Sequence, residues 1–335
     1  MISFESTKKH QRGIKLSSLL KVNKLKKYFP ITGGLFKRTI GHVKAVEEIS
    51  FTIDKGETLG IVGESGCGKS TTGRMIARVM DPTEGNIIFD GQDVTNLRGK
   101  RLRRYHQDVQ MVFQDPYASL NPRMSIQNII GEPLEVNNIA RGNELIETVN
   151  ELLETVGLQP EDRQKYPHEF SGGQRQRIGV ARALALNPKL IVADEVVSAL
   201  DVSVQSQILN LLTDLKEELS LAYIFISHDL SVIRHISDRV AVMYLGHLVE
   251  IADKKRFFEN TLHPYSQALL SAAPEPTRKR KRERIVLEGE VPSPANPPTG
   301  CPFHTRCPFV MDICKEVKPK LQEQKEGHLV ACHLH

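Results

Sequence analysis

The chain has 335 residues, of which 40% are hydrophobic and 25% are charged, and its formal net charge is +5. This composition is ordinary for a globular protein with one large domain plus an appendage, or with two domains. The charge excess is too small to indicate nucleic-acid binding on its own.

No apolar run reaches the ~20 residues that a membrane helix needs, and the basic N-terminus has no apolar signal-peptide core. We therefore expect a cytoplasmic protein that reaches a membrane only through a partner.

Strand-like and helical stretches alternate along most of the chain. Short β-type runs fill 21–62 and end at Gly63. The later elements follow in chain order: a helix at 71–80, strands at 87–89 and 109–113, mainly helix over 123–160, a helix at 174–186, a strand at 190–193, a helix at 203–219 and a strand at 223–226. This alternation, with nearly continuous apolar strands, predicts an α/β fold with a parallel sheet covered on both faces.

Three segments are expected. Residues 1–20 form a basic N-terminal tail, 21–265 the main α/β domain, and 266–335 an extension that holds four of the five cysteines. The extension contains a basic run at 278–284 and a proline-rich stretch at 291–298, which is linker-like by composition. The basic run is either a solvated linker or a contact for an anionic membrane surface.

A phosphate-binding loop is the strongest motif. The residues that fit G-x-x-x-x-G-K-[S/T], with Thr71 after them, are Gly63, Glu64, Ser65, Gly66, Cys67, Gly68, Lys69 and Ser70. The motif follows a strand and opens a helix, where backbone N–H groups can surround phosphate oxygens. A chance match is expected in roughly one chain in a hundred of this length. We expect Lys69 to bind the β- and γ-phosphates of ATP and Ser70 to ligate Mg²⁺.

Two carboxylates end the apolar strand at 190–193. Asp194 is placed to hold Mg²⁺, and Glu195 to orient the attacking water and accept its proton. Alone, such a pair is more often a solvated turn; beside the phosphate loop, a catalytic role is the better interpretation.

A second glycine-containing segment before a helix could also bind phosphate, and it points to a family resemblance. Ser171, Gly172, Gly173 and Gln174 precede a helix, where they would otherwise form only a helix cap. Together with the loop and the acidic pair, they resemble the signature of the ATP-binding-cassette (ABC) family over about 21–270. The resemblance implies a head-to-tail dimer in which each ATP lies between the loop of one subunit and the signature of the other. It also implies a RecA-like parallel-sheet core with antiparallel β and helical subdomains.

Other positions match further family elements. The resemblance implies that Gln114 touches Mg²⁺ or the attacking water, that Asp201 crosses the dimer seam and that His228 contacts the γ-phosphate. Tyr28 is the aromatic expected to stack on adenine, with Phe29 as its competitor. The chain departs from the family at Val196, where a proline is usual; Glu195 could then be held less rigidly.

Three stretches resemble the ATPases of oligopeptide/dipeptide importers, in particular their second ATPase subunit type. They are 114–123, 263–270 and the group of cysteines near the C-terminus. The resemblance implies a bacterial importer with a paralogous ATPase subunit, two transmembrane permeases and an extracellular solute-binding protein. The chain would lie peripherally on the cytoplasmic face of the inner membrane, with no nucleic acid expected. The alternatives are a soluble ABC-type ATPase in nucleic-acid processing and a component of phosphonate metabolism.

Four cysteines crowd the last 35 residues, at Cys301, Cys307, Cys314 and Cys332. In a reducing compartment this clustering favours metal ligation over disulfides. No pair has the C-x-x-C spacing of structural zinc sites, whereas four thiolates can hold a [4Fe–4S] cluster. The importer resemblance implies that cluster, with Zn²⁺ or free thiols as the alternatives, in a small lobe with few apolar runs of its own.

Overall fold

The computed structural model describes residues 18–33, 38–115, 117–273 and 285–335. Most of the expected tail and the basic run at 278–284 therefore lie outside the described residues. Leu19 and Leu20, which fall inside the expected tail, are buried.

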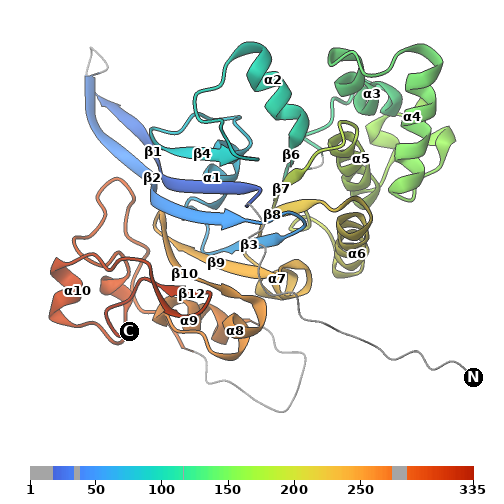
Figure 1. The fold of residues 1–335 in the computed structure, drawn as a ribbon. Helices are drawn as coiled ribbons and strands as arrows, with labels where there is room; N and C mark the ends of the chain where they lie inside the picture. The colour runs from blue at the N-terminus through green and yellow to red at the C-terminus, as the bar shows by residue number, and fades with distance from the viewer. Residues whose placement is uncertain (1–17, 34–37, 116, 274–284) are drawn as a thin grey trace, which may run out of the picture.

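An eight-stranded sheet forms the centre of the fold (Figure 1). Its strand order is β11 (Gln322–Lys325), β12 (His328–Val330), β10 (His247–Asp253), β9 (Arg239–Tyr244), β3 (Thr58–Val62), β8 (Ala222–Ile226), β7 (Leu190–Asp194) and β6 (Val109–Val112). The pairs from β9 to β6 are parallel and those from β9 to β11 antiparallel. Because β3, β7 and β8 are buried along their whole length, the predicted parallel sheet covered on both faces is confirmed.

A smaller antiparallel sheet packs against one face of the parallel strands. Its strand order is β2 (Arg38–Ile53), β1 (Leu20–Gly33), β4 (Glu84–Phe89) and β5 (Gln92–Asp93). Helix α1 (Lys69–Ile76) joins the core between the two sheets through Met75 and Ile76. Alternate residues of β8 divide between two cores, since Ile224 faces this one and Phe225 the other.

Helices cover the other face of the parallel strands. They are α3 (Ile126–Val136), α4 (Gly142–Thr155), α5 (Gly172–Leu184), α6 (Val202–Leu219) and α7 (Leu230–Ile236). In Figure 1, α3, α4 and α5 form a group on the side of the view away from β1 and β2. Among the described residues, no helix is long and apolar enough to cross a bilayer.

Several elements differ from the sequence-based expectation. The stretch 123–160 is two α-helices because the chain turns at Asn138 and Gly142, whose φ angles are 56° and 60°. Helix α2 (Gly99–Asp108) and the β9–β10 hairpin are absent from the predicted elements. The hairpin turns through Leu245 and Gly246, both at positive φ. Tight hairpins usually show Asn or Asp where this one has leucine, so the usual signal is missing.

The C-terminal residues are built into the main fold. Their elements are α8 (Lys254–Glu259), α9 (Pro264–Ala272), a short 3₁₀ turn (His304–Arg306), α10 (Asp312–Glu316), β11 and β12. The expected boundary between 265 and 266 falls inside α9. Strand β12 extends the central sheet through β10, and Phe303 is buried in the main core. The few apolar runs of this segment are therefore explained in part by a core that it shares with the rest of the chain.

A buried carboxylate joins three of these elements. Glu250 on β10 is fully buried and accepts hydrogen bonds from the backbone N–H groups of Leu262 (2.8 Å) and His263 (3.0 Å) and from Nε2 of His328 (2.7 Å). Nδ1 of His263 accepts a hydrogen bond from the backbone N–H of Tyr265 at 3.1 Å and so caps α9. Burial lowers the pKa of His263 to about 4, against the nearby charge of Glu250, which raises it.

We predict that acid weakens this junction. In the unfolded chain His263 titrates near pH 6.5, whereas the folded chain keeps it neutral down to about pH 4. The unfolded state therefore binds an extra proton, and the free energy of unfolding should fall by about 3 kcal/mol as the pH drops from 7 to 4. His263→Asn keeps a capping oxygen without the titration, so urea unfolding curves of this variant should depend less on pH. An exposed control, His168→Asn, should retain the wild-type dependence; equal slopes for all three proteins would contradict the assignment.

Candidate active site

The loop at 63–70 joins the end of β3 to the start of α1 and approaches other backbone segments closely. A Cβ atom on Gly63 would lie 2.1 Å from the carbonyl oxygen of Met243, and one on Gly68 would lie 2.3 Å from that of Ala45. Both glycines also have positive φ, 154° and 102°. The backbone path of the loop therefore requires glycine at these two positions.

Lys69 lies inside the curve of this loop. Its ammonium donates hydrogen bonds to the carbonyl oxygens of Gly63 (2.8 Å) and Glu64 (3.0 Å), and the residue is buried. The N-terminus of α1 has no side-chain cap, which leaves its first N–H groups for an acceptor such as phosphate. A phosphate bound in the loop would accept hydrogen bonds from the Lys69 ammonium in place of these carbonyl oxygens.

Ser70 and Asp194 form the expected pair at the strand end. The Ser70 hydroxyl donates to Oδ1 of Asp194 at 2.7 Å. Burial raises the pKa of Asp194, and this hydrogen bond and the nearby Arg74 counteract the shift. A hydroxyl and a carboxylate side by side are the ligand types that Mg²⁺ takes at nucleotide sites.

The ends of three parallel strands bring Gln114, Glu195 and His228 together. Nε2 of Gln114, after β6, donates to Oε2 of Glu195 at 2.8 Å. Nδ1 of His228, after β8, lies 3.5 Å from Oε1 of Glu195. The Glu195 carboxylate is mostly buried, with 16% of its side chain exposed. Gln114 and His228 thus lie against the two oxygens of the Glu195 carboxylate, next in sequence to Asp194.

The turn after Glu195 is fixed without a proline. Glu195 has φ 50°, and its carbonyl oxygen accepts hydrogen bonds from both the N–H (3.1 Å) and the hydroxyl (2.9 Å) of Ser198. Val196 and Val197 are buried in the core. Ser198 and this packing therefore hold Glu195 in place where the family pattern has proline at 196.

Ser171 caps α5 and residues 172–174 begin it, where Gly172 lies near Leu200 and Gly173 near Val204. Oγ of Ser171 accepts from the N–H of Gln174 (3.3 Å), whose Oε1 accepts from the N–H of Ser171 (3.0 Å). Gly172 and Gly173 are partly exposed. Asp201 caps α6 by accepting from the N–H of Val204 at 3.0 Å. No described hydrogen bond joins either segment to 63–70.

Tyr28 lies on β1 opposite Lys44, one residue from the Ala45 that touches the loop. Its hydroxyl donates to the Glu47 carboxylate at 2.6 Å, and the Lys44 ammonium lies 5.7 Å from its ring centroid. Adenine stacking on Tyr28 remains a prediction.

Glu64 has two partners that the sequence does not suggest. Its N–H donates to the Tyr265 hydroxyl at 2.9 Å, and its carboxylate pairs with Arg306. Tyr265 belongs to the importer-like stretch 263–270, and Arg306 precedes Cys307, but nothing in their spacing connects them to the loop.

The four C-terminal cysteines influence one another electrostatically. Burial raises the pKa of Cys301 to about 11, and the other three thiols add to the shift. The N–H of Cys301 donates to the carbonyl oxygen of Cys314 at 2.8 Å. Within the described part of the chain, however, no group of three or more His, Cys, Asp or Glu side chains is arranged to hold a metal ion.

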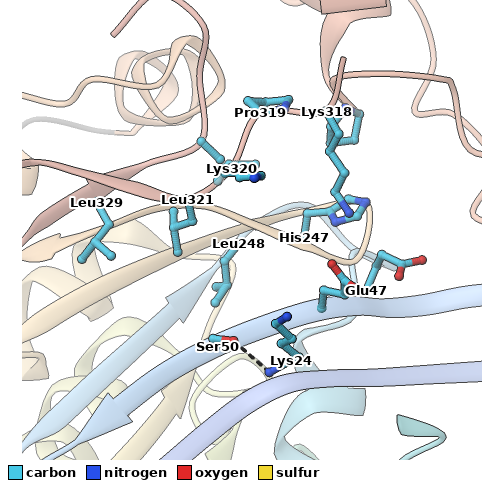
Figure 2. Close-up of a pocket in the computed structure, with 14 residues that line it drawn as sticks. Lys24, Glu47, Ser50, His247, Leu248, Lys318, Pro319, Lys320, Leu321 and Leu329 are labelled. Atoms are coloured by element: carbon cyan, nitrogen blue, oxygen red, sulfur yellow. Dashed lines mark hydrogen bonds between the residues drawn. The ribbon is translucent and has the colours of Figure 1, made fainter. Parts of the chain in front are cut away.

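A cavity of about 580 Å³ lies where the C-terminal segment meets the antiparallel sheet (Figure 2). The charged side chains that line it include Lys24, Glu47 and Lys318. Burial lowers the pKa of Lys318. The cavity contains none of the predicted site residues.

Comparison with known proteins decides the family. Residues 46–198 match the family described as ABC transporter, and 249–314 match the Oligopeptide/dipeptide transporter, C-terminal region. The chain is 60% identical, over 95% of its length, to Oligopeptide transport ATP-binding protein AppF of Bacillus subtilis, of which it covers 98%. The chain belongs to the ABC transporter ATP-binding proteins.

Further similarities agree with this membership. This ATP-binding protein is 54% identical to a probable peptide ABC transporter ATP-binding protein of Sinorhizobium fredii, over 95% of this chain and 90% of that one. Its fold resembles MJ0796, an ATP-binding cassette solved as a dimer in a post-hydrolysis state with ADP and phosphate. The TM-score is 0.62 at 29% identity, covering 70% of this chain and 98% of that one. The chain is accordingly an ATPase of the transporter class.

We predict that Ser198 replaces the missing proline. Ser198→Ala removes the hydroxyl bond to the Glu195 carbonyl oxygen, so turnover of ATP should slow by about twofold to tenfold, the equivalent of one neutral hydrogen bond. Steady-state phosphate release measures the effect. Ser206→Ala, which removes an exposed hydroxyl bond within α6, is the matched control. If both variants turn over ATP at the wild-type rate, Ser198 has no part in holding Glu195.

Proposed function

We propose that the chain is one ATPase subunit of a bacterial peptide importer and that its 63–70 loop forms half of a shared ATP site. The observation that carries the proposal is the set of strand-end residues beside the loop, together with a signature segment at the start of α5 that no described hydrogen bond joins to the loop. In this arrangement, the signature of a second, paralogous ATP-binding subunit completes the site, and Ser171–Gln174 complete the partner's site.

The strand-end residues account for hydrolysis. Lys69 and the N–H groups at the start of α1 bind the phosphates, while Ser70 and Asp194 are the ligands for Mg²⁺. Mg²⁺, when bound, neutralises charge on the β- and γ-phosphates. Glu195 accepts a proton from water as the water oxygen bonds to the γ-phosphorus and the bond to the β–γ bridging oxygen breaks. Gln114 and His228 hold the Glu195 carboxylate from either side.

A groove beside Gln114 supports a membrane partner. It has a volume of about 710 Å³, and its lining includes residues of β6, α1, α2 and α5 and Asp194 of β7. Phe113, Met111 and Val79 give it apolar walls, and His106 and Arg182 give it polar ones. A permease segment seated here would contact the residues that follow β6 and so reach Gln114. Through such permeases the chain lies peripherally at the cytoplasmic face of the membrane.

The assignment of peptides as cargo rests on the names of the relatives. The two relatives described above are named as peptide or oligopeptide transport proteins, and 249–314 matches a region described by the same solutes. The solute itself would be recognised by the permeases and an extracellular binding protein.

The cysteines support a [4Fe–4S] cluster as a structural group. Burial raises the pKa of Cys301, Cys307 and Cys332, and neighbouring cysteines add to each shift, so these thiols lie within electrostatic range of other cysteines. No pair of these cysteines has the C-x-x-C spacing of structural zinc sites, whereas four thiolates can hold a cluster, so the spacing favours a cluster over Zn²⁺. The cluster, when bound, would cross-link the segment from 301 to 332.

Changing the catalytic carboxylate tests the ATPase assignment and its partners together. Glu195→Gln should bind ATP but lose about 10²- to 10⁴-fold in hydrolysis, because the amide cannot accept the proton. The closed dimer should then persist, so a tagged variant extracted from membranes with ATP should retain a second ATP-binding subunit and two permeases better than wild type does.

The control is Glu218→Gln, an exposed carboxylate on α6. It should hydrolyse ATP at the wild-type rate. Undiminished turnover by Glu195→Gln would reject Glu195 as the base, and recovery of the chain with nucleic acid and without permeases would reject the importer.

Replacing two cysteines tests the cluster. We expect the native protein to be brown and to contain iron, and Cys307→Ser with Cys314→Ser to abolish the visible absorption and the iron. Cys67→Ser, in the loop, should leave both unchanged. A colourless native protein with stoichiometric zinc would overturn the cluster in favour of the metal ion.

A further inference from the structure

The C-terminal segment contacts the phosphate loop through one paired guanidinium. Arg306 donates from its two terminal nitrogens to the two carboxylate oxygens of Glu64, at 2.8 and 3.2 Å. Only 8% of the Arg306 side chain is exposed, against 30% of Glu64. Glu64, with help from Tyr244, raises the pKa of Arg306. Such two-point pairing fixes direction as well as distance.

A tyrosine holds the same loop residue by its backbone. The hydroxyl of Tyr265 accepts the N–H of Glu64 at 2.9 Å. Tyr265 is fully buried, and its ring centroid lies 4.7 Å from that of Tyr244 and 5.4 Å from that of Phe303. Burial raises the pKa of Tyr265, so the phenol stays neutral. This side chain is a rigid support, because aromatic neighbours fix its ring on more than one side.

Glu64, which Arg306 and Tyr265 hold, also contacts Lys69. The carbonyl oxygen of Glu64 accepts a hydrogen bond from the Lys69 ammonium at 3.0 Å. Glu64 therefore contacts Arg306 through its carboxylate, Tyr265 through its N–H and Lys69 through its carbonyl oxygen. A shift of Glu64 changes both the curve of the loop and the position of the ammonium that faces the phosphates.

We propose that Tyr265 and Arg306 are positioning residues for the nucleotide phosphates. By fixing Glu64 they hold the phosphate loop in its binding conformation, and the C-terminal segment thereby sets the affinity for ATP. The inference rests on the proposed function, since it takes 63–70 as the ATP loop. An ordinary surface ion pair would contribute little; this pair is mostly shielded and is attached to the loop itself.

The test compares ATP affinity with stability. Arg306→Ala and Glu64→Ala should each weaken equilibrium binding of a fluorescent ATP analogue by about tenfold, within the range of twofold to thirtyfold expected for residues that act through a neighbour. The double variant should bind no more weakly than either single variant, because both remove the same contact. Arg306→Lys should restore binding only in part, since an ammonium cannot make the two-point contact.

Two further variants separate positioning from folding. Tyr265→Phe keeps the buried ring and removes only the acceptor for the Glu64 N–H, so it should weaken ATP binding with a small change in melting temperature. Lys315→Ala removes an exposed ion pair with Asp312 in the same C-terminal segment and should leave ATP affinity unchanged.

The inference is overturned if Arg306→Ala, Glu64→Ala and Tyr265→Phe lower the melting temperature yet bind ATP as tightly as wild type. It is also overturned if the effects of Arg306→Ala and Glu64→Ala on affinity add in the double variant. A wild-type chain that binds no ATP would instead reject the proposed function.

Discussion

The close packing of the phosphate loop against neighbouring backbone is the constraint on which the rest of the structure depends. Gly63 leaves no room for a side chain beside the carbonyl oxygen of Met243 at the end of β9, and Gly68 leaves none beside Ala45 of β2. The loop also accepts, at the carbonyl oxygen of Cys67, the N–H of Gly246 in the β9–β10 turn. It is therefore held by both sheets at once, which is how a short glycine-rich segment can present its N–H groups and Lys69 without rearranging.

The parts of this site that the sequence predicts are those with local chemical signatures. The loop requires glycine, lysine and a hydroxyl in fixed order, and the acidic pair follows an apolar strand. Because parallel strands end at one edge of the sheet, the meeting of Gln114, Glu195 and His228 follows from placing each after a strand. Contacts between distant segments have no such signature. Arg306 lies 242 residues from Glu64, and neither residue type at its position indicates the other. The sequence does not predict the β9–β10 turn, because Leu245 adopts a positive φ at a position where asparagine is usual.

At Val196 the chain departs from a family pattern, and hydrogen bonds and burial hold the turn there. A proline would restrict the turn after Glu195 by covalent means. Here Ser198 binds the Glu195 carbonyl oxygen twice, and buried Val196 and Val197 anchor the same turn in the core. The positive φ of Glu195 costs some strain, which these contacts offset. Hydrogen bonds and burial can thus hold a carboxylate-bearing turn that has no proline.

The end of β9 makes the loop and the C-terminal segment one packing unit. Met243 faces the core between the sheets and touches Gly63 with its carbonyl oxygen, while the next residue, Tyr244, faces the opposite core and packs against Phe303. One strand end therefore contacts the phosphate loop through the carbonyl oxygen of Met243 and the cysteine-containing segment through the side chain of Tyr244. Displacement of Phe303 would therefore reach the loop by two routes, through Tyr244 and through Tyr265. This arrangement gives the C-terminal segment a direct mechanical connection to the nucleotide site.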